Sequence, residues 1–387
     1  MKLAFLAVFL IIVLVVSVFI GYSFLALESS EYTTPELFVG VDVAYDNMEE
    51  IKGLVDEISN YTNTFVIGST GITYDINKLN EVCTYVYDKD MYFMIYMHPQ
   101  NEAEQRLEQR QWVADAGTRW NRHFLGLYTF DEPGGRQLDN ATYKVFDEKP
   151  TNYTDAENKY VSGLNDVLDY IRGDPIYAGD STLFTSDYAL YWFDYKGGYD
   201  VVFGEFGWNY SRQLNVALDR GAATVQNKDW GVMITWTYNH PPYLESGPKL
   251  YDDLILAYDS GAKYILIFDT NENYTGGILE QEHLDALRQF WNYIKNNPRK
   301  SAAASERVAY VLPKSFAYGF RGPNDKIWGF WEANEQSYEI GVQLGKLLDD
   351  YGNRLDIIYE DGLSSVDSTD YGKLIFWDGT VYEPLVR

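Results

Sequence analysis

The chain has 387 residues, of which 46% are hydrophobic, and this combination excludes a mainly disordered protein and allows a large buried core. Its formal net charge of -26 argues against nucleic acid as a partner, because so acidic a surface repels phosphate backbones. The single cysteine, Cys83, excludes a disulfide framework and a zinc site built from cysteines.

Residues 1–27 form a predominantly apolar segment with a single basic residue, Lys2, near its start. A membrane-spanning helix needs about 20 such residues, whereas the apolar core of a cleaved signal peptide has about 7–15. The length of the segment and the lack of a clear small-x-small cleavage site favour an uncleaved anchor over residues 1–27. A cleaved signal and secretion are the alternative, and either way the bulk of the chain is expected outside the cell.

Asn-x-Ser/Thr patterns, the acceptors of N-glycosylation, support this location. They occur at Asn60, Asn140, Asn152, Asn209 and Asn273. We therefore expect a glycoprotein held to the cell membrane by its N-terminal helix, with a cell-surface layer among its potential partners.

After a polar linker at 28–36, strand-like apolar runs alternate with segments of helical periodicity up to residue 300. The runs are LFVGVDVAY, TFVIGST, MYFMIYMHP, FLGLYTFDEP, TLFTSDY, DVVFGEFGW, WGVMITWTY and KYILIFDT. A polar insertion, at about 135–157, follows the fourth run. Near-continuous apolar strands that alternate with amphipathic helices indicate a parallel sheet, and eight such units predict a (β/α)8 TIM barrel. A doubly wound open sheet is the alternative, although no G-x-G-x-x-G follows the first strand.

The pattern restarts near residue 305. The runs RVAYVLP, LDIIYED and GKLIFWDG read as strands, and SYEIGVQLGKLLDDYG reads as a helix. We therefore expect a small C-terminal α/β domain over 305–387, after a barrel over 37–300.

Active sites of TIM barrels lie at the C-terminal ends of the strands. In chain order, the polar residues at these ends are Asp42; Ser69 and Thr70; His98; Asp131 and Glu132; Ser186 and Asp187; Glu205, Trp208 and Asn209; Trp236, Tyr238, Asn239 and His240; Asp269 and Asn271. Asp42 and Glu205 interrupt apolar runs, where burial raises a carboxyl pKa and makes general-acid chemistry available. Polar residues that merely lead each strand into solvent are the alternative interpretation.

A carboxylate pair among aromatic residues is typical of glycoside hydrolysis, in which one carboxyl protonates the leaving oxygen and the other acts at the sugar. We assign Glu132 as the proton donor, Glu205 as the second carboxylate, and Asp131 as a neighbour that orients Glu132 or acts on the sugar directly. The expected substrate-binding residues are Asp42, His98, Trp208, Asn209, Trp236, Tyr238, His240 and Asp269. No metal and no cofactor is expected, and the expected partner is an oligo- or polysaccharide.

With these residues the predicted barrel resembles those of glycoside hydrolases, over residues 37 to about 297. In the commonest clan, strand four ends Asn-Glu and a Glu ends strand seven, whereas this chain has Asp131-Glu132 and TWTYNH. The Asp-Glu pair is similar to that of substrate-assisted hexosaminidases. That resemblance implies that Asp131 assists an acetamido group and Glu132 is the acid, with Trp236 or Tyr238 in the pocket. A barrel followed by a small α/β domain also resembles some β-galactosidase-like enzymes.

Other functions stay open at this point. Metal-dependent hydrolases of this fold usually have H-x-H on the first strand, where this chain has VDV, and a site of His98, His240 and Asp269 would have to replace it. The missing carboxylate on strand seven favours a non-catalytic glycan-binding or structural barrel at the cell surface. Trp208 and Trp236 fit a core as well as a sugar platform.

Overall fold

The computed structural model describes residues 35–98, 102–172, 181–237, 243–299, 306–366 and 370–383. The predicted anchor at 1–27 and the predicted site residues Tyr238 and His240 lie outside these ranges, so these assignments stay predictions. Within the described ranges, no helix combines the length and the apolar character that crossing a membrane requires. The chain from Leu37 onward forms one compact unit.

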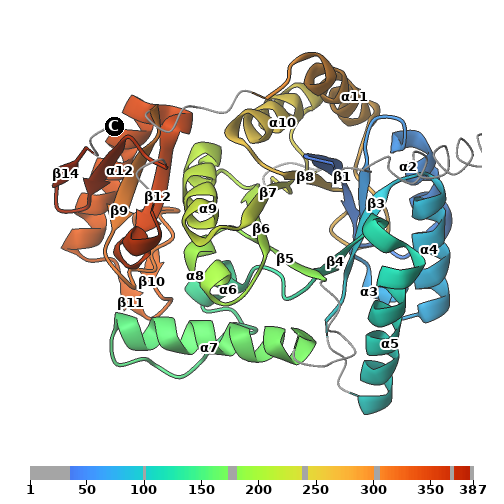
Figure 1. The fold of residues 1–387 in the computed structure, drawn as a ribbon, viewed down its shortest axis with the longest axis horizontal. Helices are drawn as coiled ribbons and strands as arrows, with labels where there is room; N and C mark the ends of the chain where they lie inside the picture. Colours follow the sequence, from blue (N-terminus) through green and yellow to red (C-terminus); the bar gives the residue numbers. More distant parts are fainter. Residues whose placement is uncertain are drawn as a thin grey trace, which may run out of the picture. The chain divides into compact units, whose positions relative to one another are not determined.

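A closed barrel of eight parallel strands forms most of this unit and confirms the predicted TIM barrel (Figure 1). The strands pair in sequence order, and the first closes against the last. They are β1 (Phe38–Val43), β2 (Thr64–Ile67), β3 (Tyr92–Tyr96), β4 (Phe124–Tyr128), β5 (Thr182–Asp187), β6 (Val201–Phe206), β7 (Asp229–Ile234) and β8 (Tyr264–Phe268).

Side chains of alternate strand residues fill the interior of the barrel. Phe184 and Phe203 stack with ring centroids 5.6 Å apart, and Tyr264 meets Phe184 edge-on at 5.3 Å. The buried interior cluster consists of Phe38, Val66, Tyr92, Met94, Tyr128, Phe184, Val201, Phe203, Met233, Tyr264 and Leu266. Because this interior is packed, a cavity on the barrel axis has to lie above the cluster, at the ends of the strands.

Helices surround the barrel and bury their apolar faces against the outward-facing strand residues (Figure 1). They are α2 (Met48–Ile58), α3 (Thr70–Thr73), α4 (Ile76–Asp88), α5 (Ala103–Arg119), α6 (Pro133–Leu138), α7 (Tyr153–Arg172), α8 (Tyr191–Lys196), α9 (Arg212–Gln226), α10 (Gly247–Ser260) and α11 (Gln281–Asn296), with a short 3-10 helix at Asn121–His123.

The predicted polar insertion at 135–157 is only partly correct. Its first residues belong to the buried helix α6, and α7 begins at Tyr153, before the insertion was expected to end. The pair Gly134 and Gly135 reads as a loop signal in the sequence. In the fold, the carboxylate of Asp187 accepts hydrogen bonds from both backbone amides, which stabilises a helix start at this point.

A second sheet follows the barrel and packs with a long helix, in the arrangement expected for a small α/β layer. Three parallel strands and one antiparallel edge strand run in the order β12-β9-β13-β14. The elements are β9 (Val308–Leu312), the pair β10 (Lys326–Ile327) and β11 (Trp331–Glu332), α12 (Glu335–Tyr351), β12 (Leu355–Tyr359), β13 (Lys373–Phe376) and β14 (Val381–Tyr382), with 3-10 turns at Gly352–Arg354 and Glu360–Ser365.

Helix α9 joins this sheet to the barrel, because it contacts β6 on one side and β12 on the other. The buried Arg220 of α9 donates from Nε to Asp356 Oδ1 at 2.7 Å and from Nη2 to the carbonyl oxygens of Asn353 and Leu355 at 2.7 and 3.0 Å. The neighbouring Gly221 brings the two backbones together. A Cβ atom at this residue would lie 2.3 Å from the carbonyl oxygen of Ile357.

We expect Gly221→Ala to destabilise the protein by about 1–3 kcal/mol, because the added methyl group forces α9 away from β12. The matched control is Gly53→Ala in the middle of α2, where an added Cβ would meet nothing within 4 Å. The control should instead stabilise the protein by about 0.5–1 kcal/mol, since alanine favours helix more than glycine does. Chemical denaturation measures both free energies of unfolding, and shifts of the same sign would contradict the close packing of α9 on the second sheet.

Candidate active site

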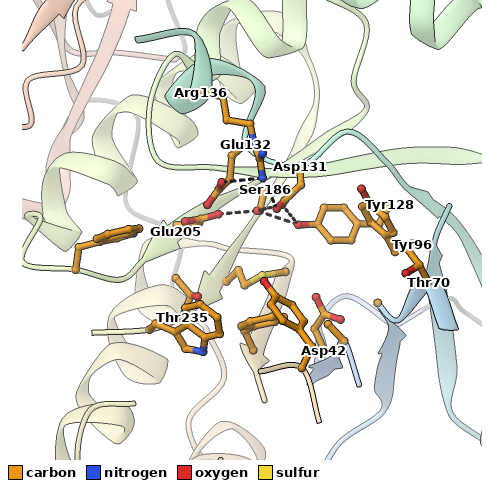
Figure 2. A pocket seen from close by; sticks show the side chains of 17 residues that line it. Asp42, Thr70, Tyr96, Tyr128, Asp131, Glu132, Arg136, Ser186, Glu205 and Thr235 are labelled. Atoms are coloured by element: carbon orange, nitrogen blue, oxygen red, sulfur yellow. Dashed lines mark hydrogen bonds and ion pairs between the residues drawn. The ribbon is translucent and has the colours of Figure 1, made fainter. Parts of the chain in front are cut away.

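A cavity of about 440 Å³ opens at the C-terminal ends of the barrel strands (Figure 2). It is lined by Asp42, Ala44, Gly68, Thr70, Tyr96, Tyr128, Asp131, Glu132, Arg136, Ser186, Glu205, Trp208, Met233, Thr235, Trp236, Phe268 and Tyr274. The structure thus brings together all three residues predicted to be catalytic. Three of the residues predicted to bind substrate, Asp42, Trp208 and Trp236, also line the cavity.

Glu132 does not end a strand, as the sequence had suggested, but follows a strained turn. Strand β4 stops at Tyr128, and the backbone then enters the left-handed region at Phe130, with φ 52°, and at Glu132, with φ 55°. Such conformations cost a non-glycine residue about 1–3 kcal/mol and persist only where surrounding contacts enforce them. One of these contacts is the hydrogen bond from the Glu132 amide to the carbonyl oxygen of Ser186, at 2.9 Å.

Asp187 holds the other side of this turn. Its buried carboxylate accepts hydrogen bonds from the amides of Gly134, Gly135, Tyr188 and Ala189, so it ties the end of β5 to the start of α6. Asp187 is therefore occupied by backbone amides and does not line the cavity. Its neighbour Ser186 faces the opposite way, into the cavity, because successive strand residues point to opposite sides.

Hydroxyl groups link two of the carboxyl groups (Figure 2). Ser186 Oγ lies 3.0 Å from Asp131 Oδ1 and 2.7 Å from Glu205 Oε1. The hydroxyl of Tyr128 contacts Asp131 Oδ1 and lies 2.9 Å from Ser186 Oγ. The two hydroxyl protons cannot serve all of these contacts at once.

A protonated Glu205 reduces this shortage. Glu205 then donates to Ser186, while Ser186 and Tyr128 both donate to Asp131, and only the contact between the two hydroxyl groups is left without a proton. Burial raises the pKa of Glu205 well above its ordinary value, and the nearby charges of Glu132 and Asp131 raise it further. The geometry and the electrostatics therefore favour the same protonation state.

Glu132 is the second carboxyl group with a raised pKa. Burial raises its pKa to about 8, the charge of Asp131 adds to the rise, and Arg136 opposes it. Arg136 Nη2 lies 3.2 Å from Glu132 Oε2 and 3.5 Å from Asp131 Oδ2, on the first turns of α6. Figure 2 shows the carboxyl groups of Glu132 and Glu205 turned toward the same space.

Asp42 lies across the cavity from Arg136 (Figure 2). It is 2% exposed, and its Oδ1 atom has no hydrogen-bond partner within the described ranges. Burial, followed by the charge of Asp131, raises its pKa well above the usual value. Asp42 is paired in the barrel sheet with Phe268, so one aromatic ring lies beside it.

Aromatic side chains form the wall next to Asp42. Trp236 lies 5.5 Å from Phe268 and 6.2 Å from Tyr274, measured between ring centroids, and its indole nitrogen donates to the carbonyl oxygen of Thr270 at 2.8 Å. Trp208 lines the cavity from the loop after β6, with a left-handed φ of 51°. These rings give the cavity apolar faces of the kind that sugar rings stack on.

Three predicted substrate-binding residues do not line the cavity. Asp269 accepts hydrogen bonds from the amides of Ile278 and Leu279 and so anchors the loop after β8. Asn209 is exposed, and His98 packs beside Phe130 with ring centroids 6.2 Å apart. The described residues hold no group of three or more His, Cys, Asp or Glu residues suited to a metal ion, but the alternative metal site includes His240, which lies outside them, and so stays untested.

The sequence analysis did not assign Tyr96, Tyr128, Arg136 or Tyr274 to the site, although all four line the cavity. Tyr96 and Tyr128 share the inward side of their strands with the interior cluster, so counting alternate residues toward each strand end would have found them. Arg136 follows Glu132 by four residues, but this relation has a meaning only once α6 is known to be a helix.

Comparisons with known proteins agree with the fold. No protein-family model matches the chain, and no curated protein matches its sequence. Among solved structures, alpha-L-fucosidase isoenzyme 2 from Paenibacillus thiaminolyticus is similar with a TM-score of 0.51 and 9% identity, over 88% of this chain and 60% of the fucosidase. The GH99 endo-alpha-mannosidase from Bacteroides thetaiotaomicron has a TM-score of 0.43 and 13% identity, over 65% of this chain and 79% of its own. The likeness to the fucosidase structure agrees with the TIM-barrel fold of this chain.

We expect Glu132→Gln to flatten the fall of stability with pH. Between the usual pKa of 4.5 and the folded value of about 8, the folded protein keeps a proton that the unfolded chain releases, so stability falls as pH rises. Removing this group should reduce the slope by up to about 1.4 kcal/mol per pH unit. Urea unfolding between pH 5 and 8 measures the slopes.

The control for this comparison is Glu104→Gln, at an exposed residue of α5. Other buried carboxyl groups also lower stability as pH rises, so the difference in slope reports Glu132 together with the groups that titrate with it. Equal slopes in the wild type, Glu132→Gln and Glu104→Gln would contradict a raised pKa at Glu132.

Proposed function

We propose that the protein is a glycoside hydrolase that acts on an oligo- or polysaccharide outside the cell. The observation that carries this proposal is the group of three carboxyl side chains, Asp131, Glu132 and Glu205, around one cavity at the mouth of the barrel. Burial raises the pKa values of Glu132 and Glu205, which makes a protonated carboxyl group available as the acid that glycoside hydrolysis requires. The glycoside hydrolase-like fold and the aromatic walls support the same function.

Glu132 is the proposed general acid. With a pKa of about 8 it carries a proton at neutral pH, and it extends from a turn that rigid backbone contacts hold at the cavity. It can therefore give this proton to the glycosidic oxygen as the bond to the leaving sugar breaks. Arg136, 3.2 Å away, stabilises the carboxylate that remains after the transfer.

Asp131 is the proposed ionised partner. It accepts hydrogen bonds from Tyr128 and Ser186, which stabilise its negative charge, and it lines the cavity. A carboxylate in this position can stabilise the positive charge at the sugar carbon and accept the proton of the attacking water. From the sequence, this role was predicted for Glu205, with Asp131 as the alternative. We infer that Glu205, protonated in the empty site, instead positions Ser186.

We also propose that the protein is anchored by residues 1–27 with its barrel outside the cell. The apolar N-terminal segment supports the anchor. The five Asn-x-Ser/Thr acceptors support exposure to glycosylation, because all of these asparagines are exposed in the structure. They are Asn60, Asn140, Asn152, Asn209 and Asn273.

A glycan-binding protein without turnover is the second candidate. The observation that favours it is the end of strand β7, where Thr235 and Trp236 line the cavity in place of a carboxylate.

The role of the acid is tested with aryl glycosides that differ in leaving group. A dinitrophenolate leaves without protonation, whereas an unactivated sugar alcohol needs a proton. We expect Glu132→Gln to lower kcat/KM on unactivated glycosides by about 10²–10⁴-fold and to change it far less on dinitrophenyl glycosides. Asp131→Asn should lower both rates to a similar extent, because it acts at the sugar carbon.

Glu104→Gln serves again as the control, and the full-length chain is assayed in a detergent without a sugar head group. If Glu132→Gln lowers kcat/KM equally on both kinds of substrate, Glu132 is not the general acid. Binding of glycans by the wild type without turnover of any glycoside would favour the binding protein and overturn the hydrolase.

A further inference from the structure

Acidic side chains outnumber basic ones around the cavity. Four carboxyl side chains line it, namely Asp42, Asp131, Glu132 and Glu205. Arg136 is the one cationic side chain among the described residues of the lining, and it already pairs with Asp131 and Glu132. The far side of the cavity, around Asp42, therefore has acidic character without a cation from the described residues.

Asp42 is the unusual member of this group because it lacks a partner. Asp131 and Glu205 share the hydroxyl of Ser186, and Glu132 has Arg136, whereas Asp42 Oδ1 is buried with no hydrogen-bond partner in the described ranges. A buried carboxyl group without a partner is costly, and in a cavity it marks a place where a ligand supplies the missing donor. Within the described ranges, no backbone amide donates to Asp42 Oδ1, whereas backbone amides donate to the buried carboxyl group of Asp187.

The wall beside Asp42 favours a positively charged donor. Phe268 is the sheet neighbour of Asp42, and its ring lies 5.5 Å from Trp236, which in turn lies 6.2 Å from Tyr274. Aromatic faces attract cations through the negative charge of their π-systems, and this attraction is strongest where water is excluded. A buried carboxyl group beside a continuous aromatic wall suits an ammonium group, because a bound cation offsets the burial that raises the pKa of Asp42 and so favours its ionised form.

We propose that the cavity selects a sugar that carries a free amine, and that its ammonium group binds Asp42 against the wall formed by Trp236, Phe268 and Tyr274. The inference rests on the proposed function, since it names the substrate class of the same site. An acidic sugar is disfavoured because Arg136, the cationic side chain among the described residues of the lining, lies across the cavity from Asp42 and already pairs with Asp131 and Glu132. A neutral sugar leaves Asp42 with only a hydroxyl donor.

The test uses sets of three sugars that differ at one atom group. Each set holds an oligosaccharide with a free 2-amine, its N-acetyl counterpart and its 2-hydroxyl counterpart, for glucose, galactose and mannose series. Calorimetric titration of the full-length chain at pH 6 measures binding, and product release is followed in the same samples. In at least one set we expect the amine to bind roughly tenfold tighter or better than both counterparts.

Asp42→Asn should remove this preference, because the amide keeps the size of the side chain but cannot become negatively charged. The wild-type comparison does not depend on how this variant folds. No preference for the amine in any set, tighter binding of the N-acetyl member, or a preference that survives Asp42→Asn would overturn the inference.

The outcome for the hydrolase is read separately. Hydrolysis of neutral sugars without a preference for amines would support the proposed hydrolase function and contradict the proposed amine site. Selective binding of amines with no hydrolysis in any set would keep the amine site and remove the hydrolase.

Discussion

The site depends on a single buried carboxylate that takes no part in the proposed chemistry. Asp187 gathers four backbone amides, from Gly134 and Gly135 on one segment and from Tyr188 and Ala189 on its own. By this means the end of β5 fixes the start of α6 and holds Glu132 in a left-handed conformation. Were the turn free to relax, Glu132 and Arg136 would lose their common position. The strain at Glu132 is thus balanced by hydrogen bonds elsewhere.

The four carboxyl groups around the cavity differ in their hydrogen-bond and charge partners, and these differences give them different roles. Asp131 is surrounded by donors, Glu205 shares a hydroxyl, Glu132 has one guanidinium, and Asp42 has no partner in the described ranges. Because these carboxyl groups are largely buried, such differences decide which of them carry protons. The groups titrate together, so a ligand that brings a charge to one of them changes the proton distribution over all.

Much of the fold followed from periodicity, because parallel strands buried on both sides leave continuous apolar runs that alternate with helices. Strand-end position identified Asp42, Asp131, Glu132 and Glu205, but it did not give the direction of a side chain. Asp269 directly follows the inward-facing Phe268 and so points away from the axis, where loop amides take its carboxylate. Arg136 and the bent path at Glu132 depend on contacts with β5 that are distant in sequence, and no local pattern encodes them.

Helix α9 has a consequence for how the protein is made. Its outer side carries Arg220, Gly221 and Thr224, whose partners lie on the second sheet, more than eighty residues later in the chain. During synthesis from the N-terminus the barrel strands are complete before these partners leave the ribosome. Until then, the side of α9 that packs on the second sheet in the folded protein is uncovered, and Arg220 lacks its partner Asp356. The nascent barrel therefore depends on the last part of the chain, and on whatever shields α9 until it arrives.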